Sequence, residues 1–136
     1  MIKIKTLLYD DIDDFKINIK FESSKNCSSL EIWGANDMFK DFAKKLMDFP
    51  FGQSKTVKFE WGKDDDKWAY YLLVSVDVVD PAGKTVIKIL TDNKAKDSNH
   101  YRCVFPIETE VAVINELGKQ LVKWTPIENE TWNFPN

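Results

Sequence analysis

Apolar and polar residues alternate along several short stretches of the chain, and a period of two is typical of a strand with one buried face. The stretch from Phe15 to Glu22 is the clearest, because phenylalanine and isoleucine alternate there with lysine, asparagine and glutamate. A longer stretch, 68–79, is rich in aromatic and β-branched residues, which predicts a central strand. Further strands are predicted at 2–8, 30–33, 55–61, 85–91 and 100–105.

Two other stretches show the spacing of an amphipathic helix. The first is predicted to have Asn36 as its N-cap and to end before Pro50 and Gly52, because proline and glycine typically follow a helix end. Its apolar stripe consists of Phe39, Phe42, Ala43 and Leu46. The second helix is predicted to begin at Pro106 and to end before Pro126. Its packing stripe consists of Ile107, Val111, Ile114, Gly118 and Leu121.

The resulting order is β-β-β-α-β-β-β-β-α, with short polar links at 23–26, 62–67 and 80–83. Short links favour antiparallel neighbours, and two one-sided helices need a common apolar face to cover. We therefore expect an α+β fold with one curved antiparallel sheet of about six to seven strands and two helices packed on one face. Residues 1–136 are predicted to form a single domain, with 126–136 as a C-terminal tail whose aromatic residues favour contact with the body.

Composition and charge narrow the range of functions. The formal net charge is -3 and the pI is about 5.2, which argues against a general nucleic-acid binder with a basic face. Arg102 is the only arginine, whereas bidentate recognition of phosphate relies on arginine. Cys27 and Cys103 lack the spacing of a metal site, so we expect two reduced thiols. We expect neither a signal peptide nor a membrane helix, and therefore a cytoplasmic protein.

The sequence predicts no catalytic residue, metal ligand or cofactor, because the common phosphate-binding, nucleophile and zinc-protease motifs are missing. Whether the chain is an enzyme stays open, with a non-catalytic role favoured; paired-carboxylate hydrolysis also stays open, although no pair stands out. His100 and Cys103 are three apart, so on a strand they would point to opposite faces. An acidic cluster near the start lacks the glycine and the final glutamate of an EF-hand loop, which favours a solvated loop. It consists of Asp10, Asp11, Asp13 and Asp14.

Two groups of residues are candidates for contact with a partner protein. The loop with three consecutive aspartates presents negative charge that suits a basic partner, while a solubilising loop tip is the other interpretation. Two tryptophans each end a strand beside a glycine, where tryptophan serves either as an interface anchor or as a lid over the core. The predicted partner-binding residues are Asp64, Asp65, Asp66, Trp33 and Trp61.

Two alternatives to protein binding remain open. The first is a small-ligand-binding protein or an unrecognised enzyme that uses the concave side of the sheet, with an enclosed pocket and converging polar groups. The residues predicted to line that pocket are Tyr70, Asp77, His100 and Arg102. The second alternative is a structural domain that forms a homodimer through a sheet edge or an open sheet face.

The stretch from Leu30 to Gly34, the phenylalanine-rich helix, Trp61 and the strand at 68–79 resemble small uncharacterised bacterial proteins built from strands, a helix and a long β-meander. The resemblance covers most of the chain, and it lies in packing motifs that include no catalytic residue. Proteins of this size and style are similar to the immunity proteins of bacterial toxin systems, which are small, often acidic and cover a toxin's active surface. The resemblance implies a module that binds another protein. The acidic charge of the chain favours a basic partner, and its charge and hydropathy predict no contact with nucleic acid or membrane.

Overall fold

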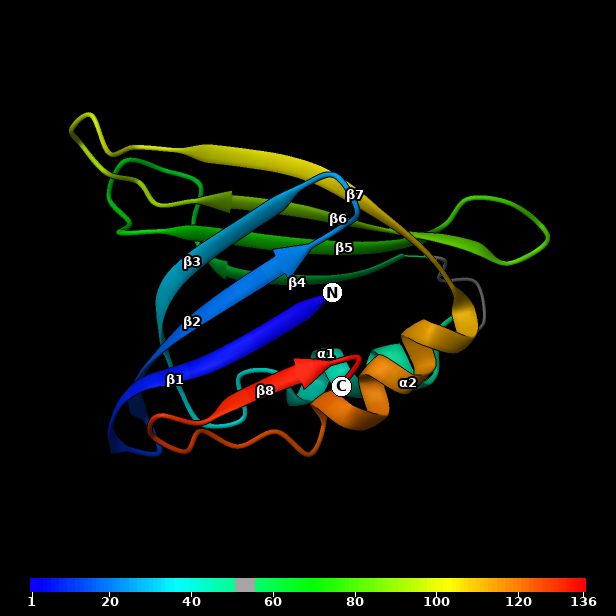
Figure 1. Ribbon diagram of the computed structural model, residues 1–136, viewed down its shortest axis with the longest axis horizontal. Helices are drawn as coiled ribbons and strands as arrows, with labels where there is room; N and C mark the ends of the chain where they lie inside the picture. Colours follow the sequence, from blue (N-terminus) through cyan, green and yellow to red (C-terminus); the bar gives the residue numbers. More distant parts are fainter. Residues whose placement is uncertain (51–55) are drawn as a thin grey trace.

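The computed structural model describes residues 1–50 and 56–136, and Figure 1 shows how their strands and helices are arranged. In chain order the elements are β1 (Ile2–Asp11), β2 (Asp14–Glu22), β3 (Cys27–Gly34), α1 (Lys40–Met47), β4 (Thr56–Gly62), β5 (Tyr71–Val78), β6 (Lys84–Asp92), β7 (Arg102–Glu110), α2 (Val111–Leu121) and β8 (Thr131–Phe134). The predicted order of strands and helices is therefore present, with β8 as an additional strand.

The strands form two antiparallel sheets of four strands each, and the predicted α+β class is confirmed. The first sheet has the order β3-β2-β1-β8, and the second has the order β4-β5-β6-β7. The division into two sheets, where one curved sheet was expected, follows from the connection between β3 and β4. That connection passes through α1, so no hairpin turn holds β4 beside β3, and β3 remains an edge strand.

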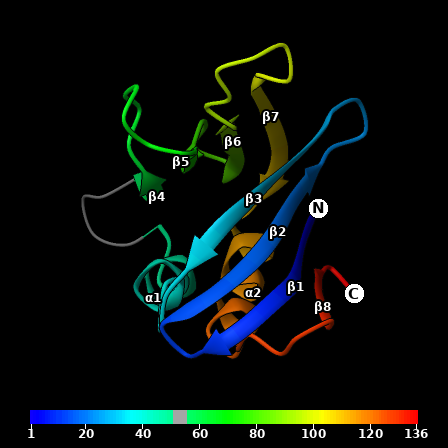
Figure 2. The ribbon, with the colours of Figure 1, turned by 90° about the vertical axis from the view of Figure 1, so that its left-hand side faces the viewer.

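The inner faces of both sheets and both helices share one apolar core. A small void of about 20 Å³ marks its centre, and the side chains around it come from β1, β2, β4, β5, β6, α1 and α2. Figure 2 shows the two helices side by side behind β1 and β2, at one end of the space between the sheets. The alternation seen in the sequence places the isoleucines and phenylalanines of β2 in this core, where Phe15, Ile17, Ile19 and Phe21 are buried.

The segment predicted as a C-terminal tail contributes β8 to the first sheet. Ile2 and Ile4 of β1 pair with Phe134 and Trp132, so the two aromatic residues lie on the sheet. Phe134 is buried, and Trp132 packs against the core with part of its surface exposed. The last strand therefore covers an edge of β1 that would otherwise be open.

The predicted start of the second helix is wrong. Pro106 lies inside β7, opposite Lys88, and α2 begins only at Val111. Because β7 is an edge strand, the missing N–H of a proline is tolerated there, and the strand continues past it. His100, which was predicted to start this strand, lies in the loop before β7.

The predicted cap of the first helix is also wrong. Asn36 lies in a turn ahead of α1, and the N-cap position is occupied by Phe39, without a side-chain cap bond. The backbone of Asp37 has a φ of 60°, a left-handed conformation that aspartate tolerates but that interrupts a helix. The predicted helix stop at Gly52 and the predicted strand start at Lys55 lie outside the described residues.

Helices α1 and α2 are in close contact at Gly118. A Cβ atom at this position would lie 2.6 Å from the carbonyl oxygen of Ala43 and 2.7 Å from the amide nitrogen of Met47. Both distances are below any normal carbon contact, so the absence of a side chain allows the two backbones to touch. The sequence placed Gly118 in the packing stripe of this helix, and the structure gives the reason.

Asn115, one turn before Gly118, holds the end of α1. Its Nδ2 atom donates to the carbonyl oxygen of Leu46 at 2.9 Å and to that of Phe49 at 2.7 Å. The last carbonyls of a helix have no partner within the helix, so a donor from the neighbouring helix satisfies them. The two helices are therefore joined by a close contact and by hydrogen bonds.

We expect Gly118→Ala to lower the free energy of unfolding by about 1–3 kcal/mol, because the added methyl group overlaps backbone atoms of α1. In an exposed helix the same change normally stabilises by about 1 kcal/mol, so the sign of the effect tests the contact. Urea denaturation of wild type and variant measures it, with Lys119→Ala on the exposed side of α2 as the control. Equal or higher stability of Gly118→Ala would contradict the close contact.

Candidate functional site

Two of the four residues predicted to line a ligand pocket meet at one end of the second sheet. Asp92 of β6 lies opposite Arg102 of β7 and is only 2% exposed. Its carboxylate accepts from the backbone N–H of Lys94 at 2.8 Å, bonds Nε2 of His100 at 2.9 Å and accepts from Nη1 of Arg102 at 2.9 Å. His100 and Arg102 therefore converge on a carboxylate that the sequence analysis left in a loop.

Arg102 also joins this group to the loop between β4 and β5. Its Nη1 and Nη2 atoms donate to the two carboxylate oxygens of Asp64, at 2.9 Å and 3.0 Å. Nζ of Lys94 lies 2.7 Å from the same carboxylate. We call the five residues the Asp92 cluster; they are Asp64, Asp92, Lys94, His100 and Arg102. The cluster ties the 62–70 loop to the 93–101 loop by charge-assisted hydrogen bonds.

The pKa values in the cluster favour its charged state. Hydrogen bonds from Arg102 and Lys94 hold the pKa of Asp64 well below its usual range. Burial of Asp92 acts in the opposite direction, but hydrogen bonds from Lys94, Arg102 and His100 outweigh it and lower the pKa of Asp92. The hydrogen bonds to Asp64 and Asp92 raise the pKa of Arg102. At neutral pH the carboxylates of Asp64 and Asp92 are therefore ionised, and their two negative charges are balanced by Lys94 and Arg102.

Tyr71 forms part of the same row of the second sheet, paired with Gly62 and Asp92. Its hydroxyl donates to Oε2 of Glu60 at 2.5 Å, and its side chain is buried. Burial, together with the bond to Glu60, raises the pKa of Tyr71 to about 12. The hydroxyl therefore stays protonated at neutral pH and acts there as a donor to Glu60.

The other two predicted pocket residues lie elsewhere. Asp77 is at the opposite end of β5, where it accepts hydrogen bonds from Thr56 at 2.5 Å and from Ser75 at 3.2 Å. The hydroxyl of Tyr70 donates to the backbone carbonyl of Trp33 at 3.3 Å. None of the four cavities described for this structure is lined by Tyr70, Asp77, His100 or Arg102.

The two predicted interface tryptophans meet where β3 approaches the second sheet. Nε1 of Trp61 donates to the carbonyl oxygen of Trp33 at 2.8 Å, and the ring of Trp61 stacks on Phe59. The side chain of Trp33 is 45% exposed and has Nζ of Lys16 5.9 Å from its ring centroid. Trp61 thus closes the core, whereas Trp33 keeps an exposed ring on the outer face of the first sheet.

The charge of the predicted acidic loop is balanced by its neighbour. Residues 63–67 carry three aspartates against two lysines, a formal charge of -1. Residues 92–102 carry two lysines and Arg102 against two aspartates, a formal charge of +1. Asp64 pairs with Arg102 and Lys94, and the backbone carbonyl of Asp66 accepts from Nζ of Lys96 at 3.0 Å. Asp65 and Asp66 keep exposed side chains, but the end of the sheet as a whole is close to neutral.

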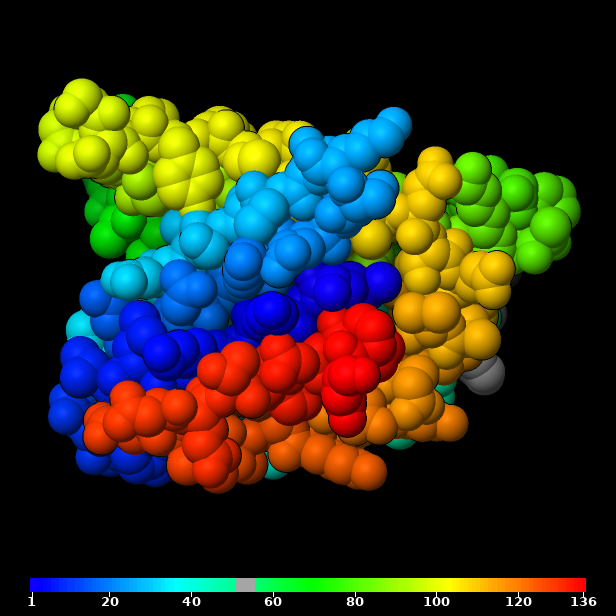
Figure 3. Space-filling model, in the orientation of Figure 1, coloured from blue at the N-terminus to red at the C-terminus, as the bar shows by residue number. Residues whose placement is uncertain are grey.

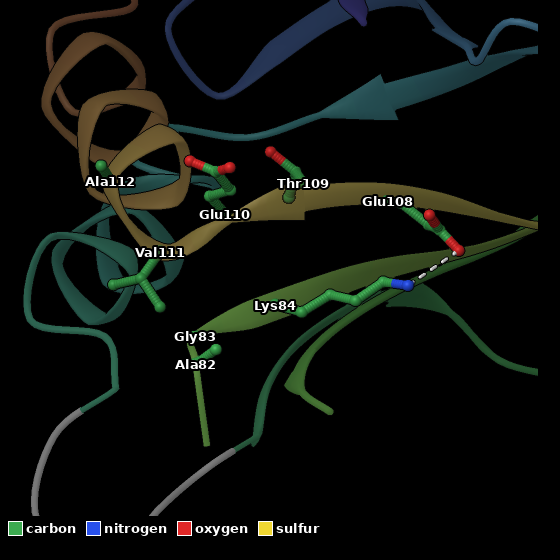
Figure 4. Close-up of a pocket in the computed structure, with 8 residues that line it drawn as sticks. All are labelled: Ala82, Gly83, Lys84, Glu108, Thr109, Glu110, Val111 and Ala112. Carbon is green, nitrogen blue, oxygen red and sulfur yellow. Dashed lines mark ion pairs between the residues drawn. The ribbon is translucent and has the colours of Figure 1, made fainter. Parts of the chain in front are cut away.

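A cavity of about 680 Å³ lies between the turn that joins β5 to β6 and the start of α2. Figure 4 shows that its charged groups do not converge. Nζ of Lys84 is directed to Oε1 of Glu108 at 3.5 Å, and the carboxylate of Glu110 points away from that pair. The cavity therefore lacks the set of polar groups aimed at one point that usually fixes a small ligand.

A different surface combines exposed apolar side chains with acidic charge. It consists of residues 8–14, where β1 turns into β2, and residues 127–130, and we call it the hairpin face. Its large apolar side chains are Leu8 at 52%, Tyr9 at 38%, Ile12 at 41% and Ile127 at 50% exposure. Figure 3 shows the two segments in contact at one end of the molecule, in blue and orange-red.

Hydrogen bonds to β1 hold residues 127–130 beside the first segment of the hairpin face. The amide of Thr6 donates to the carbonyl of Glu130 at 3.1 Å, and the amide of Asn129 donates to the carbonyl of Thr6 at 2.8 Å. The amide of Tyr9 donates to Oε1 of Glu128 at 3.0 Å. The sequence analysis singled out the aspartates of the first segment but not the glutamates, because the two segments are more than 100 residues apart in the chain.

The hairpin face concentrates the negative charge of the chain. Its six acidic residues are all exposed, and it contains no lysine or arginine, which gives a formal charge of -6. The whole chain carries -3, so the remainder of the molecule carries +3. Leu8 and Trp33 both pair with Lys16, so they lie on the outer side of the first sheet, whereas Tyr9 pairs with buried Phe15 and stacks on its ring. The acidic residues of the face are Asp10, Asp11, Asp13, Asp14, Glu128 and Glu130.

Comparison with protein-family models, with curated proteins and with solved structures finds no match for this chain. Within residues 1–50 and 56–136, no helix has both the length and the apolar character needed to cross a membrane. In the same part of the chain, no group of three or more histidine, cysteine, aspartate or glutamate side chains is placed to hold a metal ion.

We expect Asp92→Asn to lower the free energy of unfolding at pH 7 by about 1–3 kcal/mol, because buried charge-assisted hydrogen bonds are lost. The pKa of Asp92 is lowered in the folded chain, so its ionised form stabilises the fold above about pH 4, and this contribution is lost as the pH falls. The difference between wild type and variant in urea denaturation should therefore shrink as the pH is lowered below about 4.

Asp65→Asn is the control for this measurement, because the side chain of Asp65 is exposed and an asparagine oxygen still accepts the bond from the amide of Lys67. It should change the stability by less than about 0.5 kcal/mol at any of these pH values. A difference between Asp92→Asn and wild type that is the same at every pH would contradict the assigned role of the charge.

Proposed function

We propose that this chain is a non-catalytic protein-binding module that acts by covering the surface of a basic protein, in the manner of the immunity proteins of bacterial toxin systems. The observation that carries the proposal is the hairpin face, where two adjoining segments combine a formal charge of -6 with four exposed apolar side chains. Large exposed apolar side chains rimmed by polar residues are typical of surfaces that bind proteins.

The charge of the hairpin face selects the class of partner. Carboxylates repel the phosphates of nucleic acids and the headgroups of anionic membranes, and they attract lysine and arginine side chains. A second copy of the chain would place the same acidic surface against itself, which costs free energy in a symmetric contact. A basic protein is therefore the partner that the charge favours.

The Asp92 cluster supports the same assignment indirectly. Its charges are balanced within the chain, so Asp64 has little net charge to offer a partner. We therefore assign the electrostatic contact to the hairpin face and the exposed ring of Trp33, and we give the 62–70 loop a structural role. Association should be fast and salt-sensitive, because charges around an interface act mainly on the rate of encounter.

Two variants with equal changes in net charge test this proposal. We expect Asp10→Asn combined with Asp13→Asn to lower the association rate with the partner by about tenfold, because steering charges are removed. Asp65→Asn combined with Asp66→Asn removes the same charge from the 62–70 loop, outside the hairpin face, and should leave the rate within about twofold. The partner is first captured on the wild-type chain from the cells that produce it, and rates are then measured on purified proteins.

Salt provides the second arm of the test. Raising the ionic strength from about 0.05 M to about 0.5 M shortens the screening distance and should lower the wild-type association rate, with less effect on the hairpin-face variant. Equal association rates for the two double variants would show that the hairpin face does not contribute to the interaction. A wild-type rate that does not respond to salt would remove the electrostatic basis of the proposal.

A further inference from the structure

A small apolar cavity opens beside the hairpin face. Its volume is about 100 Å³, and it lies between the β1–β2 turn, the turn at 35–40 and the residues that follow α2. Ile12, which is 41% exposed, forms the outer wall of the cavity. We call it the Ile12 cavity; its apolar lining includes Ile12, Phe15, Met38, Phe39, Leu121 and Trp124.

Aromatic contacts give the Ile12 cavity a firm inner wall. The ring of Trp124 makes edge contacts with Phe15 at 5.9 Å and with Phe39 at 5.2 Å between centroids. Phe15 and Phe39 are both buried, and a Cβ added at Gly34 would lie within van der Waals overlap of Phe15, so these rings have little room to move. The cavity is therefore a fixed feature of the surface.

The size of the cavity indicates what it can accept. Sites for drug-sized molecules typically have roughly 300–1,000 Å³, so this cavity is too small for such a ligand. It has room for one aliphatic side chain. The phenylalanine, leucine and tryptophan side chains in its lining suit an apolar group, and polar lining residues such as Asn36 and Thr125 lie beside them. A side chain buried in a pocket near the centre of a contact surface is the usual form of an energetic anchor.

The charge at the rim indicates what must surround that side chain. Ile12 lies between Asp11 and Asp13 in the chain, and both aspartates are exposed. Asp37 also lines the cavity, but its charge is paired with Lys40 at 2.8 Å. The acidic charge at the rim therefore comes from the aspartates of the β1–β2 turn. Basic residues next to an aliphatic residue would meet this rim with opposite charge.

We infer that the Ile12 cavity receives one aliphatic side chain of the partner protein, presented on a segment in which lysine or arginine residues flank it. This inference rests on the proposed function and specifies how the hairpin face recognises its partner. The flanking cations meet the aspartates of the β1–β2 turn, and the aliphatic side chain fills the space in front of Phe15, Phe39 and Trp124.

Two capped synthetic peptides serve as probes, Lys-Lys-Leu-Lys-Lys and Lys-Lys-Ser-Lys-Lys, titrated into the isotopically labelled chain and followed by NMR. They carry equal charge and differ only in the central side chain. We expect the leucine peptide to bind about tenfold more tightly, because burying a leucine side chain contributes on this scale. Its largest shift changes should fall on the amide signals of residues 12, 35–40 and 124–126.

Ala35→Leu fills the cavity from one of its lining positions and should reduce the affinity for the leucine peptide to that for the serine peptide. Ala112→Leu places the same substitution at an exposed site on α2 and should leave both affinities unchanged. Ile12→Ser, at an exposed position, removes one wall of the cavity without adding bulk and should also lower the affinity for the leucine peptide. This second variant keeps the test valid if Ala35→Leu does not fold.

Three outcomes would overturn the inference: equal affinities for the two peptides, shift changes confined to other parts of the chain, or no binding of either peptide at millimolar concentration. If both peptides bind residues 8–14 with equal, salt-sensitive affinity, the proposal of a basic partner stands, but the cavity has no role in recognition. Self-association of the chain through Ile12, seen by sedimentation and lost in Ile12→Ser, would replace the partner with a second copy and remove the inference.

Discussion

The contact between α1 and α2 joins two elements that both pack into the core shared by the sheets. Each helix contributes buried side chains to that core, so the close approach of the helices is part of the packing that holds the sheets together. Gly118 permits the backbones to touch, and Asn115 satisfies the carbonyls at the end of α1. The same pair of helices positions the Ile12 cavity, whose inner wall includes Phe39 just before α1 and Leu121 at the end of α2. The same pair of helices therefore contributes both to the core and to the inner wall of the surface cavity.

Charges in this chain are used in two different ways. Around Asp92 they are brought together and neutralised, and the resulting hydrogen bonds fix two loops at one end of the second sheet. A carboxylate as buried as Asp92 needs such partners, because an unpaired charge in the interior is costly. On the hairpin face the carboxylates are exposed and have no cation among residues 8–14 or 127–130. Only the second arrangement leaves an electric field that another molecule can sense.

Local sequence patterns predicted the fold class and most of the strands, because alternation and helical spacing are properties of neighbouring residues. They did not predict the separation into two sheets, which depends on the path of the chain between β3 and β4. Pro106 was assigned to a helix start because proline is common there, and its tolerance in an edge strand depends on a neighbour that the local pattern does not reveal. The prediction that the first helix begins just after Asn36 was wrong for a similar reason, because Asp37 has a left-handed backbone conformation that the local pattern does not reveal.

The candidate sites were harder to predict, since each is assembled from distant parts of the chain. The sequence brought His100 and Arg102 into one group but not their shared partner Asp92. Pairing the two flanking strands across the loop would have placed Asp92 opposite Arg102, so the register of a hairpin was the missing signal. The hairpin face had no comparable local signal, because the pairing of β8 with β1 and hydrogen bonds to Thr6 and Tyr9 bring residues 127–130 beside it from the other end of the chain.

In the proposed interaction, the hairpin face and the Ile12 cavity would act through two forces with different ranges. Exposed carboxylates act over roughly a screening length of about 10 Å and govern how often a basic partner arrives in a suitable orientation. An apolar side chain in a small cavity acts only at contact and governs how long the partner remains. Because Ile12 lies among the aspartates in sequence and in space, a partner drawn in by charge is delivered to the opening of the cavity. Specificity then depends on both conditions being met by one segment of the partner, which a merely basic protein does not satisfy.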